Sequence, residues 1–190
     1  MMGMSAGSEL TGQLLVATPQ IDEGIFYRCV VLLLHHGPDG AQGVVLGRAL
    51  PALVDAVLPG WGSSDRGSGM LFQGGPVEVD SALAVAQVPG IGEPLPGVRG
   101  IFSGIGLVDL DSDPALVLPT VERLRVFAGY SGWAPGQLEM EIARGSWYVV
   151  ARAVGDAFAP AECNLWREVL ARQRGPLALV ATYPADPGLN

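Results

Sequence analysis

The sequence contains no lysine, so all 11 of its basic residues are arginines, and 19 carboxylates give the chain a net charge of −8. Without a lysine amine, Schiff-base catalysis is excluded. Binding to nucleic-acid phosphates needs a basic face, whereas the arginines are scattered singly among the acidic residues. Direct nucleic-acid binding is therefore not expected.

Long apolar runs are absent as well. The longest is CVVLLL at positions 29–34, far short of the roughly 20 residues that a membrane-spanning helix needs. The N-terminal MMGMSAGSEL has neither the basic region nor the apolar stretch of a secretion signal. We therefore expect a cytoplasmic protein that makes no contact with a membrane.

Metal-ligating residues are few and poorly spaced. Cys29 and Cys163 form no CxxC or Cys/His pattern, which predicts two buried free thiols in a reducing compartment. The aspartates of DLDSDP at 109–114 alternate as at the start of an EF-hand loop, but Pro114 stands where that loop needs glycine. Asp113 is instead predicted to cap a helix, and we expect neither a metal nor another cofactor.

What the chain does contain is material for one continuous core. It has 190 residues, of which 49% are apolar and 16% charged, a size and composition typical of a single globular unit. We therefore treat residues 1–190 as one domain. Within it, residues 1–9 are predicted to be a loose head, and the Gly- and Ser-rich residues 59–69 a mobile surface loop.

Apolar periodicity and turn residues define the expected elements. Pro51 can open a helix that Pro59 ends, and GPDG at 37–40 joins two strands into a hairpin. An α+β fold follows, with a mixed, largely antiparallel sheet and short flanking helices. Strands are predicted within 12–19, 28–36, 41–48, 70–77, 81–88, 98–110, 123–130 and 146–154, and helices within 51–58, 113–124, 135–144 and 161–172.

The most distinctive segment is GYSGWAPGQLEMEIARGSW at 129–147. Gly129 and Gly132 allow close backbone approach or a positive φ, while Tyr130 and Trp133 offer large flat surfaces with one polar atom each. Such residues suit a ligand pocket, and they equally suit a core corner where a strand turns under a helix. Ser131 does not fit the G-x-S-x-G nucleophile motif, because Trp133 replaces the second glycine.

Two further patterns contain residue types that can do chemistry. His35 and His36, the only histidines, lie near Asp39, and such a grouping can supply an acid and a base. Because neighbouring strand residues point to opposite faces, the two rings are not expected to share a metal ion. Gly74 and Gly75 could cradle an anion, but no lysine or clear helix start follows them, which favours a turn.

Four segments together resemble the YqgE/AlgH family of bacterial proteins. They are GQLLVATP at 12–19, HGPDGAQGVVLGR at 36–48, GGPV at 74–77 and the segment 129–147, with DPGLN at the C-terminus as a typical ending. The resemblance implies a cytoplasmic α+β fold of unestablished activity, without agreed catalytic residues, in which one branch has a proposed role in transcriptional control of alginate production.

The chain departs from the family pattern at three places. Gly47 and Ala49 flank Arg48 where the family usually has Asn-Arg-Pro, and no histidine occurs near Ala86. Any chemistry that depends on those groups in other members is not expected here.

These observations predict a non-catalytic, regulatory module that binds an unknown small molecule or protein partner. The alternatives are a hydrolase using His36 and Asp39, and a transcriptional regulator. The residues predicted to form the binding groove are His36, Arg48, Gly74, Gly75, Pro76, Gly129, Tyr130, Gly132, Trp133 and Gln137.

Overall fold

A computed structural model describes residues 9–62, 68–90 and 94–185 of the chain. Ten strands form one mixed sheet in the order β10-β1-β2-β3-β9-β6-β8-β7, with β4 and β5 beside this path. The pairings are antiparallel except that of β5 with β9. The strands are β1 (Leu14–Ala17), β2 (Val30–Gly37), β3 (Gly40–Val45), β4 (Ala49–Leu53), β5 (Met70–Gln73), β6 (Val77–Gln87), β7 (Val98–Phe102), β8 (Ile105–Val108), β9 (Arg123–Trp133) and β10 (Trp147–Val150).

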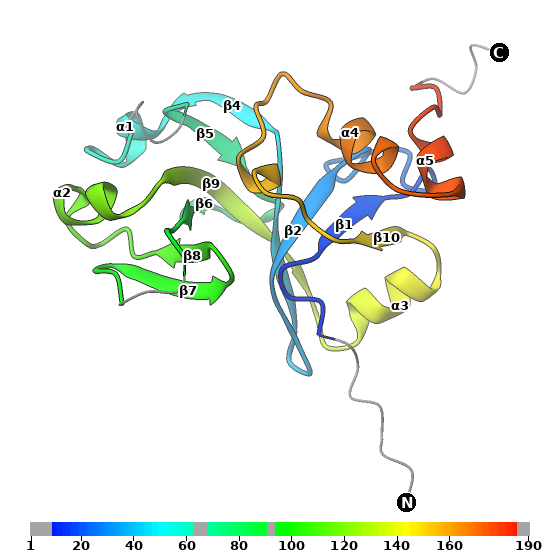
Figure 1. The fold of residues 1–190 in the computed structure, drawn as a ribbon, viewed down its shortest axis with the longest axis horizontal. Helices are drawn as coiled ribbons and strands as arrows, with labels where there is room; N and C mark the ends of the chain where they lie inside the picture. The colour runs from blue at the N-terminus through cyan, green and yellow to red at the C-terminus, as the bar shows by residue number, and fades with distance from the viewer. Residues whose placement is uncertain (1–8, 63–67, 91–93, 186–190) are drawn as a thin grey trace, which may run out of the picture.

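Short helices surround this sheet (Figure 1). They are α1 (Val54–Val57), α2 (Pro114–Val117), α3 (Gln137–Ala143), α4 (Leu165–Ala171) and α5 (Pro176–Val180), with 3₁₀ turns η1 (Leu118–Thr120) and η2 (Asp156–Phe158). The predicted α+β class with a mixed, largely antiparallel sheet is therefore confirmed.

One half of the sheet is made of β10, β1, β2 and β3. Within it, β1 and most of β2 are buried on both faces, whereas the edge strand β10 is exposed at Val149. Leu32 and Leu34 of β2 belong to a core that contains Trp166 of α4, while Val31 and Leu33 face a second core that contains Leu138 of α3. A strand with two buried faces needs apolar residues at every position rather than at alternate ones. This requirement explains the uninterrupted run at 30–34.

The other half of the sheet contains β6, β7 and β8, with β4 and β5 nearby, and α1 and α2 lie at its far end (Figure 1). Its core is a third cluster that includes Val54 of α1 and Val117 of α2, together with Trp61 from the connecting loop.

Strand β9 joins the two halves. Its end pairs with β3 through Gly43 and Ser131, and further back Phe127 pairs with Phe72 of β5. Along this edge of β9 the partner strand thus changes from β3 to β5, and we call this point the changeover. The GGP turn that follows β5 lies there.

Three expectations for local structure need correction. Residues 49–53 form a strand rather than the start of a helix, because Ala49 and Leu53 pair with β5, so α1 has only four residues. A helix, α5, follows Gly175 where none was predicted. Cys29 and Cys163 are free as expected, but Cys163 is half-buried rather than buried.

The predicted loose head and mobile loop fall largely outside the described residues, at 1–8 and 63–67. In the described part of that loop, Trp61 is buried, and the backbone N–H groups of Gly60 and Gly62 donate to the Asp55 carboxylate. The mobility of residues 63–67 stays a prediction.

Candidate functional site

The GGP turn and the glycines of β9 touch through their backbones. A Cβ on Gly74 would lie 2.2 Å from the Gly129 carbonyl oxygen, and one on Gly75 would lie 2.2 Å from the carbonyl of Tyr130. The Gly74 N–H donates to Ala128, and its carbonyl accepts from the buried Ser131 hydroxyl. These groups are occupied in joining strands, which leaves the Gly74 N–H unavailable for an anion.

Trp133 belongs to a hydrogen-bonded cluster at α3. Its ring is 7% exposed, and its indole N–H donates to Glu141 at 2.9 Å. The same carboxylate accepts from the Trp147 indole at 2.8 Å and from the Gln137 amide at 2.9 Å. Glu141 therefore anchors α3 to two strands, and the polar atoms of Trp133 and Gln137 have partners within the fold.

His36 is also held at both ring nitrogens. The backbone N–H of Leu10 donates to Nδ1 at 3.1 Å, so Nδ1 is the acceptor and Nε2 carries the proton. Nε2 lies 2.9 Å from a Glu139 oxygen, to which it donates. Two hydrogen bonds lower the pKa of the Glu139 carboxyl: one from the backbone of Glu139 itself and one from His36.

Asp39 contacts the other histidine. Its carboxylate lies 2.9 Å from His35 Nε2, and this hydrogen bond lowers the pKa of the Asp39 carboxyl. His35 is exposed whereas His36 is buried, as expected for neighbours in a strand. A hydrolase of the expected kind would use His36 and Asp39 together. The fold instead pairs His36 with Glu139 and Asp39 with His35.

Arg48 lies in a different place from His36. His36 pairs with Ala41 near the start of β3, while Arg48 follows the end of that strand. The four residue-to-residue steps from Ala41 to Val45 alone separate the two positions by about 13 Å along the strand, at roughly 3.3 Å per step.

A pocket of about 320 Å³ opens beside Arg48. Its walls come from three parts of the chain: the start of β2, the segment after β3 and the beginning of α4. We call it the arginine pocket, and it is lined by Arg28, Val30, Leu46, Gly47, Arg48, Glu162, Cys163, Asn164, Leu165 and Trp166.

Both arginines are positioned by neutral groups. Arg28 lies over the Trp166 ring, with 4.6 Å from Cζ to the ring centroid, and its Nη2 donates to the carbonyls of Tyr183 and Pro184. Arg48 Nη2 donates to the Tyr27 carbonyl. In the described part of the chain neither guanidinium forms an ion pair with a carboxylate.

The two thiols of the chain are poor nucleophiles. Burial raises the pKa of Cys29 to about 12, and burial also raises the pKa of Cys163, which lines the arginine pocket. Because the thiolate is the reactive form, neither cysteine is activated for covalent chemistry at neutral pH.

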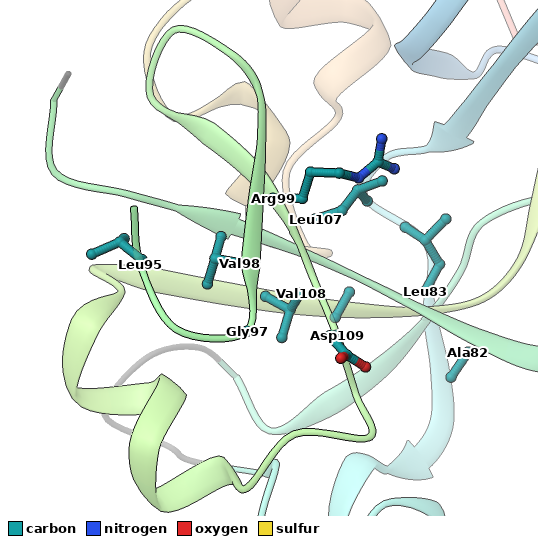
Figure 2. Close-up of a pocket in the computed structure, with 10 residues that line it drawn as sticks. Ala82, Leu83, Leu95, Gly97, Val98, Arg99, Leu107, Val108 and Asp109 are labelled. Atoms are coloured by element: carbon teal, nitrogen blue, oxygen red, sulfur yellow. The ribbon is translucent and has the colours of Figure 1, made fainter. Parts of the chain in front are cut away.

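Two further hollows lie around β7 and β8. One, of about 500 Å³, is formed by β6, β7, β8 and the residues that flank them. Figure 2 shows that its two charged side chains, Arg99 and Asp109, lie apart. The other, of about 860 Å³, is lined by apolar residues and glycines with Ser103 as its one polar side chain. Neither presents a set of converging polar groups.

The fold therefore divides the ten predicted residues into three groups. His36, Trp133 and Gln137 lie around α3, while Gly74, Gly75, Pro76, Gly129, Tyr130 and Gly132 lie at or near the changeover between β3 and β5. Arg48 alone lines the arginine pocket. A binding role for all ten residues stays a prediction.

Sequence reasoning missed Arg28 and the residues around Cys163. The available signals were an isolated arginine directly before an apolar strand and an asparagine positioned to cap a helix. Asn164 does cap α4, accepting from the Arg167 N–H at 3.1 Å. Nothing in the sequence indicates that these two segments meet.

Among residues 9–62, 68–90 and 94–185, none of the helices combines the length and apolar character needed to cross a membrane. Within the same ranges, no three His, Cys, Asp or Glu side chains gather in a way that could hold a metal ion.

Comparison with known proteins places these features in a family. A UPF0301 protein of Streptomyces coelicolor is 54% identical over 193 residues that cover all of both chains, and one of Thermobifida fusca is 45% identical over 95% of this chain and 96% of its own.

Two solved structures are similar. A crystal structure of a Corynebacterium diphtheriae protein has a TM-score of 0.85 and 31% identity, covering 95% of each chain. The solution structure of AlgH from Pseudomonas aeruginosa has a TM-score of 0.69 over 96% of this chain and 98% of its own, and at 22% identity it supports the fold alone. Residues 14–178 match the sequence profile of the AlgH-like family, and the chain is a member of that family.

Proposed function

We propose that this protein is a non-catalytic, regulatory module that binds a small molecule in the arginine pocket. The observation that carries the proposal is the pocket itself. It has a volume of about 320 Å³ and brings together charged and apolar side chains from three distant parts of the chain. That volume is at the lower end of the range for small-molecule sites, which combine apolar walls with a few placed polar groups.

The titratable groups elsewhere support binding rather than catalysis. His36 uses both ring nitrogens within the fold, Asp39 is bonded to His35, and the Ser131 hydroxyl donates to a buried carbonyl. A nucleophile with an adjacent base is the minimum for covalent hydrolysis, and these contacts supply no such pair. We therefore do not propose a hydrolase.

A regulatory role would act through the ligand or a protein partner. The net charge of −8 opposes approach to DNA phosphates, so direct DNA contact is not part of the proposal.

The test is a ligand-observed NMR screen of a fragment library of mixed charge, repeated on three variants. Fragments that bind in the arginine pocket should lose affinity in Arg48→Ala. They should keep it in Trp133→Phe, because Trp133 belongs to the core around Leu138 of α3 and does not line the pocket. Arg144→Ala is the matched control, because it removes an exposed arginine directly after α3 that does not line the pocket. Binding that is weakened by Trp133→Phe but not by Arg48→Ala would place the site at α3 instead, and a screen without any binder would contradict the proposal.

A further inference from the structure

We infer that the arginine pocket selects an oxyanion: a small organic molecule that carries a carboxylate or phosphate group on an apolar body. The inference rests on the binding module proposed above and adds the chemical class of its ligand. It depends on the spare hydrogen-bond donors of Arg28 and Arg48, on their charge, and on the apolar floor beneath them.

The first step concerns hydrogen-bond capacity. A guanidinium has five N–H donors. Arg28 uses its Nη2 group for the carbonyls of Tyr183 and Pro184, and Arg48 uses one Nη2 bond to Tyr27. For the remaining nitrogens the described residues provide no acceptor, and no buried side-chain nitrogen of these residues lacks a partner. The unused donors are therefore accessible to solvent rather than buried. Guanidinium donors of this kind bind carboxylates and phosphates in a forked geometry.

The second step concerns charge. The pocket is lined by two arginines and one glutamate, Glu162, which leaves a formal charge of +1 in a protein whose net charge is −8. Glu162 is exposed and forms no ion pair with either arginine. The positive field reaches the buried neighbour Cys29, where Arg48 acts to lower the thiol pKa against the larger effect of burial. A local positive charge of this kind favours an anion and opposes a cation.

The third step concerns positioning. Trp166 is 3% exposed and fixed by a 2.8 Å hydrogen bond from its indole N–H to the Ala17 carbonyl, so it forms a rigid support for the Arg28 guanidinium. Arg28 itself adopts a φ of 47°, a left-handed conformation that is unfavourable for a non-glycine residue. A fixed guanidinium loses little entropy when it binds a ligand, and retained backbone strain is characteristic of functional positions.

The apolar part of the ligand follows from the remaining walls. Val30, Leu46, Leu165 and Trp166 are all buried residues that line the pocket. Because they are almost fully buried, they leave a small apolar surface that can contact the edge of a ring or a short hydrocarbon chain, while Arg28 and Arg48 bind its anionic group.

The experiment uses three matched probes on the full chain: benzoate, phenyl phosphate and the neutral benzyl alcohol. The readout is the indole N–H resonance of Trp166 in ¹H–¹⁵N spectra, because this ring lines the pocket. Both anions should shift the resonance in a saturable way at millimolar concentration, and benzyl alcohol should bind at least about tenfold more weakly, as expected for losing one charge-assisted interaction. Added NaCl should weaken the anions alone.

Variants separate charge from shape. Arg48→Gln should weaken both anions by about tenfold or more, Arg48→Lys should have an intermediate effect because it keeps the charge but loses the fork, and the distant Arg144→Gln should have none. The wild-type comparison of charged and neutral probes holds even if a variant fails to fold. Equal binding of all three probes would overturn the oxyanion inference but leave the binding module intact, and a pocket that responds to fragments yet to neither anion would do the same. A pocket that responds to no compound of any charge would overturn both.

Discussion

At the scale of single residues, Glu141 shows how this fold uses its polar side chains. One carboxylate accepts hydrogen bonds from two indoles and an amide, all within the segment 129–147. The indoles of Trp133 and Trp147 also pack edge to face, with 6.0 Å between their ring centroids. The aromatic residues that make this segment so distinctive are thus packed and hydrogen-bonded around a single acidic side chain.

We predict that Glu141→Ala lowers the free energy of unfolding by about 2–4 kcal/mol. The change leaves the N–H groups of two buried indoles without an acceptor, and each unsatisfied group costs about 1–3 kcal/mol. Urea unfolding followed by tryptophan fluorescence measures the effect. Arg144→Ala, directly after the same helix, is the control, and since Arg144 is exposed it should cost less than about 1 kcal/mol. Equal losses in the two variants would contradict this account of α3.

At the scale of elements, the changeover from β3 to β5 depends on two chain segments that approach without side chains. Gly74 and Gly75 face Gly129 and Tyr130 so closely that any Cβ would overlap backbone atoms. Gly129 also has a φ of 68°, which side chains rarely adopt. The pattern of glycines in GGPV and GYSGW is therefore required by packing between β9 and the turn.

The corresponding prediction is that Gly74→Ala destabilises the protein by about 3 kcal/mol or more, because backbone must move to admit the methyl group. Gly100→Ala in β7 is the matched control: no heavy atom lies within 4 Å of its hypothetical Cβ, so it should change stability by less than about 1 kcal/mol. Thermal unfolding by circular dichroism distinguishes the two. A tolerated Gly74→Ala would show that the turn can move away from β9.

At the scale of the whole molecule, the segment after β10 ties the parts together. Asp156 is 7% exposed and binds Arg172 of the α4 end with two contacts, one of them 2.7 Å long. In the same segment, shortly after Asp156, the carbonyls of Phe158 and Ala159 accept hydrogen bonds from Arg125 of β9 at 3.2 and 2.6 Å. Burial lowers the pKa of Arg125 to about 10, so it stays charged at neutral pH. This segment connects β9 to the helices that cover the opposite half of the sheet.

Loss of that connection should destabilise both halves of the sheet. We predict that Asp156→Ala lowers the free energy of unfolding by about 3 kcal/mol, since removing one partner leaves a partly buried arginine unpaired. Far-UV circular dichroism and tryptophan fluorescence should shift by the same amount, because the shared strand β9 makes unfolding one cooperative transition.

Asp80→Ala, an exposed change of the same type, should shift neither signal by more than about 0.5 kcal/mol. Two separate transitions in Asp156→Ala would show that the halves of the sheet unfold independently.

Much of this architecture could be predicted from the sequence. Local chemistry determined the hairpin around GPDG, the capping of α2 by Asp113, which accepts from the Ala115 N–H at 2.9 Å, and the α+β class. These features depend on residues close together in the chain, so pattern and propensity are sufficient to predict them. The first part of the helix expected at 51–58 is a strand for the opposite reason, because pairing with β5 outweighed the local preference, and only Val54–Val57 is helical.

The candidate site, like the pairing of β4 with β5, depends on contacts between segments that are distant in the sequence. The sequence by itself determined that the chain lacks the lysine, the metal-ligand spacing and the nucleophile motifs of several enzyme classes, and it indicated Arg48 as a residue to examine. Only the tertiary structure decided that Arg48 meets Arg28 and the start of α4, while His36, Gly74 and Trp133 are engaged in packing and hydrogen bonds. Contacts between segments more than 100 residues apart arise from the burial of apolar surface as a whole, and that burial leaves no local pattern in the residues it brings together.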